Sequence, residues 1–384
     1  MASEWTTVRA ADFIEFNPRL IIKKGAMATK VAMDKLQPFT KKIPATEQAE
    51  FAGGSKFCNG DTIMARITPC LENGKTAYVD ILADGEVAFG STEFIVMRAR
   101  GGISDPQFVY YLATSPAFRN VAIKSMVGSS GRQRVQQGVL DELELTVPPL
   151  EEQQKIGAFL AALDQKIALN NKINDNLQQQ AMALYASMFL DNPTLETTAG
   201  TLKDIADITM GQSPSGSSYN EDGNGEVFFQ GRAEFGYRFP TRRLFTTEPK
   251  RMAEAGDVLL SVRAPVGDLN VAYERCCIGR GLGAIHGRNG YQSFVLYTMF
   301  ALRQQLDVYN GEGTVFGSIN RNALNDMPID IPPEDAIAAF EAVVRPMDDM
   351  IRTNYEENCR LQELRDSLLP RLMSGEVDVS DIDI

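Results

Sequence analysis

Apolar side chains recur at alternating spacings of four and three residues over one long stretch of the chain, from Leu150 to Asp191. The positions of this seam are Ile156, Leu160, Leu163, Ile167, Asn170, Asn174, Leu177, Ala181, Leu184 and Met188. The spacing is that of a heptad repeat, and after Pro149 the stretch contains no further proline. It therefore predicts one long helix that pairs with a second helix.

The second helix is present in the same chain. Every seam position has a counterpart 184 residues later, and the counterparts are Phe340, Val344, Met347, Ile351, Asn354, Asn358, Leu361, Arg365, Leu368 and Leu372. Both Asn positions are repeated. We interpret the chain as an internal duplication, in which each half is a globular domain followed by a long helix. The expected boundaries are 1–149 and 192–333 for the domains, 150–191 and 334–375 for the helices, and 376–384 for an acidic tail that nothing specifies as folded.

Both domains combine strand and helix patterns, which predicts an α+β fold. In the first domain, runs rich in β-branched residues, separated by Asn-Gly and Asp-Gly turns, predict strands at Thr62–Ile67, Thr76–Leu82 and Glu93–Arg98. An Asp-Pro pair at 105 and 106 then predicts the start of a helix that continues to about Met126. The second domain repeats this order, with a strand opening after Gly256-Asp257 and a helix from Tyr291 to about Tyr309.

The net charge of −12 at first argues against a nucleic-acid partner, but its distribution along the chain changes that reading. Residues 1–147 carry a net charge of +1 and residues 201–333 carry −2, so both domains are nearly neutral. The helices and the tail carry the remaining acidity. Each domain can therefore present a local basic surface.

Two segments are candidates for such a surface. The first, from Arg19 to Lys42, reads as a basic loop with six lysines. The second, from Phe228 to Arg243, interleaves aromatic residues with arginines, a composition that suits nucleic acid because guanidinium groups bind phosphates and base edges. For Phe228, Phe229 and Phe235 themselves, core packing is the preferred interpretation.

Motifs for catalysis, metal binding and membrane insertion are missing from the sequence. The five cysteines form no CxxC pair and are expected to be reduced thiols, and His286 is the only histidine, expected to be partly buried with its hydrogen bonds satisfied. No glycine-rich phosphate loop and no base-flipping Asn/Asp-Pro-Pro-aromatic motif occurs, so no cofactor is expected. No apolar run approaches the roughly 20 residues that span a bilayer, and we expect a cytoplasmic protein.

Four sequence features together resemble the specificity subunit of type I restriction-modification enzymes. They are the VPPLEEQQKI entry to an Asn-containing long helix, the GQSPSG loop, the GDVLLSVRAPVG run and the pair of half-repeats. In that family each domain is a target recognition domain that reads one half of a split DNA sequence. The two long helices form an antiparallel coiled coil that spaces the domains.

The resemblance also implies partners. They would be double-stranded DNA, two methyltransferase subunits that dock on the chain, and restriction subunits with endonuclease and translocase activity, while the chain itself would not be an enzyme. The expected DNA-binding residues are Lys23, Lys24, Lys41, Lys42, Arg66, Arg132, Arg134, Gln212, Ser213, Arg232, Arg242, Arg243 and Arg263. The second repeat has IPPEDAIAAF in place of VPPLEEQQKI, which leaves open whether both junctions dock partners equally.

The resemblance also gives the helices a geometric role. The seam from Ile156 to Met188 would form a rod of about 50 Å at roughly 1.5 Å per residue, longer than one DNA turn of about 34–36 Å. If the helices pair antiparallel, Asn170 faces Asn358 and Asn174 faces Asn354, and these polar contacts fix the helix register. Two alternatives remain open from the sequence, a self-contained DNA-modifying enzyme and a coiled-coil assembly protein that does not bind DNA.

Overall fold

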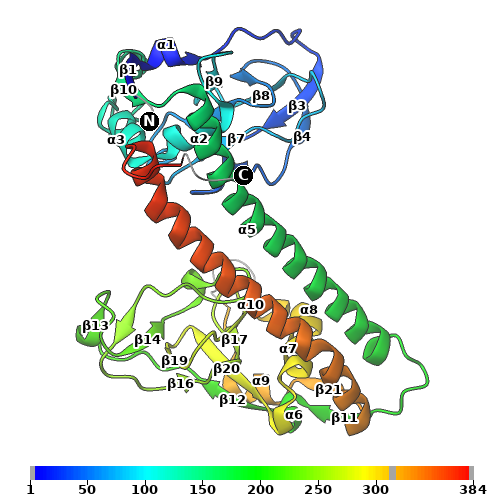
Figure 1. Ribbon diagram of the computed structural model, residues 1–384. Helices are drawn as coiled ribbons and strands as arrows, with labels where there is room; N and C mark the ends of the chain where they lie inside the picture. The colour runs from blue at the N-terminus through cyan, green and yellow to red at the C-terminus, as the bar shows by residue number, and fades with distance from the viewer. Residues whose placement is uncertain (1–4, 311–316, 380–384) are drawn as a thin grey trace. The chain divides into compact units, whose positions relative to one another are not determined.

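The computed structural model describes residues 5–310 and 317–379, and the chain divides into two compact units (Figure 1). Unit 1 comprises Met1–Asn170 and Tyr355–Ile384, and unit 2 comprises Asn171–Asn354. The division falls inside both long helices. Each unit therefore contains one globular domain together with a part of each helix.

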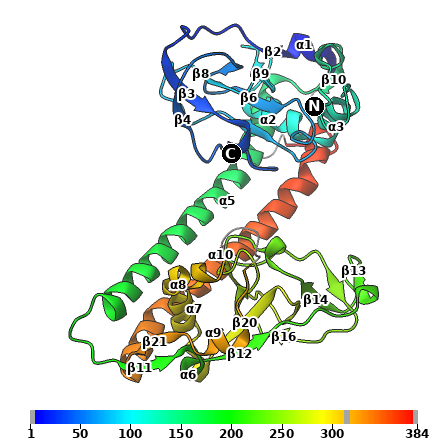
Figure 2. The same ribbon diagram turned by 180° about the vertical axis from the view of Figure 1, so that it is seen from behind.

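The domain of unit 1 contains two four-stranded sheets and a two-stranded ribbon. The first sheet has the order β2 (Ile14–Phe16), β9 (Phe94–Ala99), β6 (Thr62–Ala65), β7 (Thr76–Tyr78), and three of its strands are labelled in Figure 2. The second sheet has the order β4 (Glu47–Glu50), β3 (Met27–Val31), β8 (Ala88–Gly90), β5 (Lys56–Phe57). The ribbon pairs β1 (Thr6–Arg9) with β10 (Glu144–Val147).

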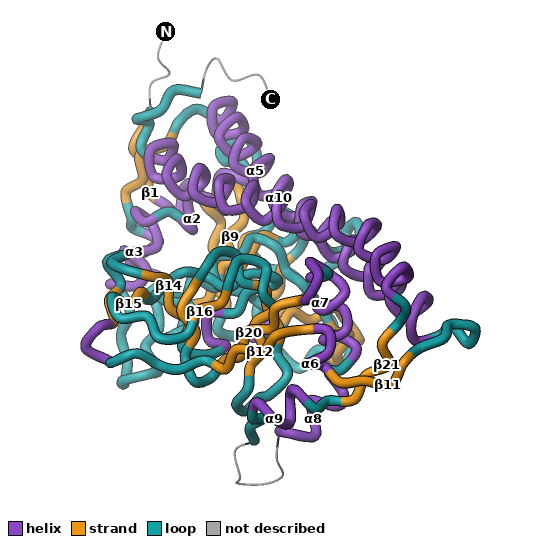
Figure 3. Tube along the Cα trace, turned by 90° about the horizontal axis from the view of Figure 1, so that it is seen from below, coloured by secondary structure: helices purple, strands orange, loops and turns teal. Residues whose placement is uncertain are grey.

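The domain of unit 2 also contains two sheets and a two-stranded ribbon, and several of its strands are labelled in Figure 3. Its first sheet has the order β12 (Ala206–Met210), β20 (Leu282–Gly287), β17 (Val258–Ser261), β18 (Leu269–Val271). Its second sheet has the order β13 (Tyr219–Asn220), β15 (Phe245–Thr246), β14 (Glu226–Phe229), β19 (Cys276–Ile278), β16 (Met252–Ala253). Its ribbon pairs β11 (Thr198–Thr201) with β21 (Pro328–Ile331).

The strands of the two domains correspond, except that the second sheet of unit 2 has one additional edge strand, β13. In both, the ribbon joins the first strand of the domain to the last, and the first sheet has the same order. The second sheets each contain one parallel pair among antiparallel neighbours, β3 with β8 in unit 1 and β14 with β19 in unit 2. This agreement confirms the α+β class and the duplication that the helix seams predicted.

The helix expected from Asp105 to Met126 is in fact two helices, α2 (Pro106–Thr114) and α3 (Pro116–Lys124). Asp105 caps α2 as expected, accepting a hydrogen bond from the Phe108 backbone at 2.9 Å. Ser115 interrupts the helix because the residue before a proline is driven to extended backbone, here with ψ 147°. In unit 2 the equivalent region is likewise divided, into α7 (Gln292–Ala301) and α8 (Arg303–Asp307).

The remaining short helices lie in the connections between strands. The α-helical ones are α1 (Ala10–Phe13), α4 (Gln137–Asp141), α6 (Leu202–Ile205) and α9 (Arg321–Asn325). The 3-10 turns are η1 (Met33–Lys35), η3 (Gly216–Ser218), η4 (Arg232–Glu234), η5 (Arg288–Gly290) and η6 (Val308–Asn310).

The long helices are α5 (Leu150–Tyr185), followed by a π-helical turn, η2 (Ala186–Leu190), and α10 (Glu334–Met373). Inside each unit their segments run antiparallel. In unit 1, Asp164 and Asn170 of α5 contact Arg365 and Asn358 of α10 in reverse order. In unit 2, the ring of Tyr185 lies 5.6 Å from that of Phe340, while Asn174 meets Asn354.

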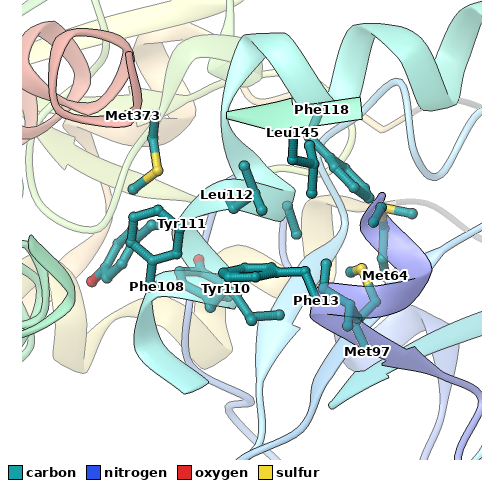
Figure 4. Close-up of a cluster of buried hydrophobic side chains, with 14 of the residues drawn as sticks. Phe13, Met64, Met97, Phe108, Tyr110, Tyr111, Leu112, Phe118, Leu145 and Met373 are labelled. Carbon is teal, nitrogen blue, oxygen red and sulfur yellow. The ribbon is translucent and has the colours of Figure 1, made fainter. Parts of the chain in front are cut away.

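The core of unit 1 shows that the chain's last segment takes part in the fold. Met373, at the end of α10, lies beside Tyr111 of α2 in this cluster (Figure 4). Val379 is fully buried in the same cluster, and Val377 packs against it. Within the segment 376–384, which was expected to be an acidic tail, Val377 and Val379 thus belong to the core of unit 1, while 380–384 lie outside the described residues.

The segment from Arg19 to Lys42 is not a simple loop either. It contains β3 at Met27–Val31, whose residue Val31 is completely buried and whose Thr29 is nearly so. Successive side chains of a strand point to opposite faces, so the two buried side chains, Thr29 and Val31, share the inner face of the sheet. The lysines that the sequence groups into one loop are consequently divided among the turn before β3, β3 itself and the loop after it.

Candidate DNA-binding surfaces

The turn before β3 presents Lys23 and Lys24 to solvent. Gly25 forms this turn with φ +82°, a conformation that glycine adopts readily, and its N–H donates to the Phe51 carbonyl at 3.0 Å. Neither lysine forms an ion pair or side-chain hydrogen bond with any described residue, and the same holds for Lys42. These three expected DNA-binding residues are thus available to phosphates.

The Gly/Ser loop from Val127 to Arg134 forms one corner of unit 1, by which we mean the place where this loop contacts Ile67, just after β6. Arg134 bridges to both Ile67 and Val127, and the Thr68 N–H donates to the Gln133 carbonyl at 3.0 Å. The tip of the loop carries Arg132, which is exposed and has no charged partner among the described residues. The backbone is tied down at the base, so the loop holds Arg132 outward.

Arg134 and Arg66 are held by the protein itself. The Arg134 guanidinium makes a bidentate ion pair with Glu93, with contacts of 2.7 and 2.9 Å, and this pairing lowers the pKa of the Glu93 carboxyl. Arg66 donates to the Val135 carbonyl at 3.3 Å, while its Nε is buried without a partner among the described atoms. Both residues support the loop that carries Arg132.

Lys41 does not fit the expectation of a DNA contact. Its ammonium group donates to Gln107 and, at 2.9 Å, to the Tyr111 hydroxyl, and it lies 4.5 to 5.3 Å from the centres of the rings of Tyr78, Tyr110 and Tyr111. Burial lowers the pKa of Lys41 to about 8. Because these groups enclose the ammonium, phosphate cannot approach it.

In unit 2, the loop at Gln212 and Ser213 packs against the end of β19. The Gln212 N–H donates to the Ile278 carbonyl at 3.0 Å, and the Ser213 hydroxyl accepts from the Arg280 N–H at 3.2 Å. The Gln212 side chain is exposed. This contact places Arg280, an exposed arginine without a described side-chain partner, beside the two expected residues.

The arginines of the aromatic segment are paired with carboxylates. Arg232 contacts Asp268 at 2.5 Å, Arg242 pairs with Glu274, and Arg243 contacts the buried Glu234 at 2.5 Å. All three guanidinium groups are about half exposed. The local surface is therefore less positive than the sequence suggests, although exposed ion pairs are weak enough to be exchanged for phosphate.

The aromatic residues of this segment are mostly internal. Phe228 and Phe229 are buried, and Phe235 packs against the apolar cluster that contains Phe229, which confirms the interpretation of core packing. His286 differs from expectation because its side chain is 58% exposed, though its Nδ1 does have a partner in Asp257 at 2.6 Å. Burial raises the pKa of the Asp257 carboxyl.

Arg263 occupies the corner of unit 2 that corresponds to the corner of Arg132. It is exposed, follows β17, and bridges through its backbone to Ser318, 184 residues after Arg134. The residues equivalent to 127–132 are 311–316, which lie outside the described residues. Each domain thus places an arginine without a described partner at the same corner of the fold.

Two further cations of this kind, Arg19 and Arg280, are not among the expected DNA-binding residues, although Arg19 opens the basic segment found in the sequence. Both are exposed, and the described residues provide no side-chain partner for either. Arg19 follows Asn17-Pro18, and the Asn17 side chain is held by the Val96 N–H at 3.0 Å and by Gln137 at 2.7 Å. Arg280 stands between Gly279 and Gly281. In both cases the sequence signal for an exposed cation is an arginine next to a proline or a glycine in a connection between strands.

The four seam asparagines form the two expected pairs. In unit 1, Asn170 donates to Asn358 at 2.9 Å and to Glu357 at 2.7 Å. In unit 2, Asn354 donates to Asn174 at 2.8 Å. All four side chains are buried, from 0% exposed for Asn170 to 7% for Asn354. Their role in fixing the register remains a prediction.

Over the described ranges, no three His, Cys, Asp or Glu side chains come together in a way that could hold a metal ion. All five cysteines are free thiols. Among the helices described, none has the length and apolar character needed to cross a membrane.

Comparison with known proteins gives matches over nearly the whole chain. Residues 2–179 and 196–363 match the family model described as type I restriction modification DNA specificity domain. A Methanocaldococcus jannaschii protein, whose name assigns it to the specificity subunit of the type I restriction enzyme MjaX, is 28% identical, with 83% of this chain and 79% of that protein covered. The type I restriction enzyme HindI specificity subunit of Haemophilus influenzae is 23% identical, with coverages of 83% and 86%.

Among solved structures, the S subunit of a type I restriction-modification system from M. genitalium resembles the chain with a TM-score of 0.56. It is 16% identical, and the match covers 96% of each chain. At this identity the likeness concerns the fold.

Proposed function

The chain belongs to the type I restriction modification DNA specificity family, and we propose on this basis that each of its two domains reads one half of a split DNA target. It is the specificity subunit of such an enzyme, and methylation and cleavage are carried out by other subunits. The interpretation as a self-contained DNA-modifying enzyme is therefore set aside.

The observation that carries the proposal is the repeated corner of the two domains. Arg132 in unit 1 and Arg263 in unit 2 are exposed and have no charged partner among the described residues. They lie on different segments of the same corner, because Arg263 bridges to Ser318 as Ile67 bridges to Arg134, two residues after Arg132. Two copies of one fold with different side chains at the same corner can read two different sequences. A single contiguous site would not require the duplication.

Recognition would combine two kinds of contact. Lysines and arginines without internal partners, such as Lys23, Lys24 and Lys42, would neutralise phosphates and fix the position of each domain on the duplex. Side chains at the corners and on the loop of Gln212 would contact base edges in the grooves, where the base pairs differ in their hydrogen-bonding groups.

The long helices would have two further roles. They would set the distance between the half-sites, and the segments around the VPPLEEQQKI entry would dock two methyltransferase subunits, with restriction subunits joining the complex. No cofactor is proposed for this chain. S-adenosylmethionine would belong to the methyltransferase subunits.

The test is to reconstitute the full chain with the methyltransferase subunits of its own system. The isolated chain should neither methylate DNA nor bind S-adenosylmethionine, while the complex should methylate DNA at a specific split sequence. S-adenosylmethionine binding by the isolated chain would support an enzyme instead. If the complex with methyltransferase has no DNA affinity, the chain is an assembly protein.

A further inference from the structure

In unit 1, one buried hydrogen-bonded group joins a loop of the domain to the long helices. Lys41, in the loop between β3 and β4, donates to the hydroxyl of Tyr111 on α2 at 2.9 Å. That hydroxyl donates to Asp164 of α5 at 2.6 Å. Asp164 in turn pairs at 2.7 Å with Arg365 of α10. The loop is thus connected to both long helices through the Tyr111 hydroxyl and the Asp164 carboxylate.

Unit 2 contains the same kind of group. Arg238, in the loop between β14 and β15, donates to the hydroxyl of Tyr297 on α7 at 3.1 Å and pairs with Asp348 of α10. The Tyr297 hydroxyl donates to Asp348 at 3.0 Å. The Arg238 side chain is only 4% exposed. The neighbouring Tyr237 hydroxyl bonds to Asp175 of α5, so this loop also reaches both long helices.

The two groups are equivalent under the duplication. Asp164 and Asp348 are 184 residues apart, the spacing of the seams. Tyr111 and Tyr297 are each the sixth residue of their helix. The two loops connect equivalent strands, since β3 and β14 are the strands that make the one parallel pairing in their sheets. The cation differs between the halves, but its place in the fold is retained.

The loop cation is a lysine in one half and an arginine in the other because the guanidinium partner of each aspartate comes from a different element. In unit 1, Arg365 of α10 gives Asp164 a guanidinium partner, and the loop contributes a lysine. In unit 2, the residue equivalent to Arg365 is Ala181, which is fully buried and carries no charge. Arg238 of the loop supplies the guanidinium there. Each aspartate therefore has one, delivered from a helix in one half and from the loop in the other.

The hydrogen-bonded side chains around Tyr111 and Tyr297 hold their loops strongly because they are buried. Burial raises the pKa of the Tyr111 and Tyr297 hydroxyls, which keeps both as hydrogen-bond donors. Removing one partner would leave a buried polar atom unsatisfied, which costs more than the bond itself contributes. The exposed parts of the same loops carry Lys42 in unit 1 and Arg242 in unit 2, both expected to bind DNA.

We propose that Lys41 and Arg238 are positioning residues, each of which fastens the β3–β4 or the β14–β15 loop to the long helices through a tyrosine and an aspartate. The fastened loop then presents its exposed cations at a fixed place. The consequence for DNA rests on the function proposed above, whereas the fastening itself does not.

Hydrogen exchange of the full-length chain tests the fastening without DNA. Tyr111→Phe removes only the hydroxyl, and it should increase amide exchange about tenfold in residues 32–46 while leaving residues 230–244 unchanged. Tyr297→Phe should do the reverse. Tyr110→Phe is the matched control, because Tyr110 is the buried neighbour of Tyr111 and its hydroxyl has no partner among the described residues. Tyr185→Phe is the control for unit 2, since it loses a buried bond to Thr298 of α7 without touching the loop.

A purely structural effect would raise exchange throughout the domain, including strands β6 and β9 or β17 and β20, and that outcome would overturn the proposal. Unchanged exchange in the fastened loop would also overturn it. Lys41→Arg should keep the loop protected and Lys41→Met should not, because the fastening needs a hydrogen-bond donor at the end of this side chain.

DNA binding by the same variants separates the two proposals. A loop released in Tyr111→Phe should lower occupancy of one half-site in a footprint of the methyltransferase complex, and Tyr297→Phe should lower the other. If the loops are released but both half-sites are unaffected, the fastening stands and the role of these loops in reading DNA fails.

Discussion

Arg132 and Arg134 are two residues apart but differ in what their charge is used for. Arg134 is neutralised by its bidentate contact with Glu93, whereas Arg132 has no counterpart of this kind among the described residues. A cation that already has a carboxylate partner gains less from a phosphate, because the existing pair must first be broken.

We therefore expect Arg132→Ala to weaken DNA binding by the methyltransferase complex about tenfold and to reduce the salt dependence of binding by about one ion, as for loss of one phosphate contact. Arg134→Ala should weaken binding less and mainly loosen the Val127–Arg134 loop. Equilibrium titrations at several salt concentrations measure both effects. Equal salt slopes for Arg132→Ala and the wild type would show that Arg132 does not contact phosphate.

Lys41 makes the stability of unit 1 depend on pH in a specific direction. Burial lowers its pKa from 10.5 to about 8, and the charged groups around it are Asp164, Asp80, Asp105 and Arg365. The unfolded chain binds more protons than the folded chain between pH 8 and 10.5, so the contribution of Lys41 to stability rises with pH across this window. Below about pH 8 the cost of burying the ammonium is fully present.

The test compares the wild type with Lys41→Met, because other groups also titrate at alkaline pH. From pH 7 to 10 the free energy of unfolding of the wild type should rise relative to that of Lys41→Met by on the order of 2 kcal/mol. Denaturant unfolding at each pH gives this difference. A constant or falling difference would show that Lys41 is buried without a lowered pKa.

At the scale of elements, the long helices carry buried asparagines where leucine would pack better. The Asn170 Oδ1 is buried with no described partner, which costs stability, while the Asn170–Asn358 bond restricts how that segment of α5 can slide along α10. Replacing all four asparagines with leucine should raise the melting temperature by about 5 °C. It should also relax the tolerated distance between half-sites, as measured on DNA targets of varied spacer length. Lower stability with unchanged spacer tolerance would contradict a register role.

The duplicated halves also show two ways of giving the first N–H groups of a helix their hydrogen-bond acceptors. The N-terminus of α7 has no cap from its own chain segment, and Glu341 of α10 accepts from the Ser293 and Phe294 N–H groups at 3.2 and 3.0 Å. In unit 1, Asp105 caps α2 locally, and the position equivalent to Glu341 is Gly157. A Cβ at Gly157 would lie 2.8 Å from the Asp105 carboxylate, so a side chain there would clash with the local cap.

The sequence was sufficient to predict the long helices and the duplication, because a heptad seam is a local pattern and the same seam occurs twice. It was insufficient for β3, since Met27–Val31 has only one large buried apolar side chain and lies among lysines. The interruption at Ser115 was readable from Pro116, but the continuous apolar pattern on either side concealed it.

The candidate site was less predictable than the fold. An arginine and its carboxylate partner can be far apart in sequence, as for Arg134 with Glu93 or Arg232 with Asp268, so a count of local charges cannot separate neutralised cations from available ones. The enclosure of Lys41 depends on three tyrosines and on a long helix, which only the folded chain brings together.

At the scale of the whole molecule, the duplication predicts that half of the chain can replace the other half. A fragment ending at Ala199 lacks the α10 residues, among them Leu372, that complete the core of unit 1. A second copy can cover its exposed seam, because the two seams share their pattern, and Asn170 of one copy would meet Asn174 of the other.

Sedimentation should show that this fragment is a dimer, and with methyltransferase subunits it should select an inverted repeat of the first half-site. The full-length chain, tested in parallel, should remain a monomer in the absence of partners and select the asymmetric target. A monomeric fragment, or a dimer that still selects the asymmetric target, would show that the seams are not self-complementary.

Selection of bound sequences from random DNA by the methyltransferase complex tests the central claim most directly, with the wild type compared with Arg132→Ala and Arg263→Ala. We predict a motif of two specified halves separated by unspecified base pairs. Arg132→Ala should degrade the preference in one half and Arg263→Ala the preference in the other. A single contiguous motif, or loss of preference in both halves from either substitution, would contradict the assignment of one domain to each half-site.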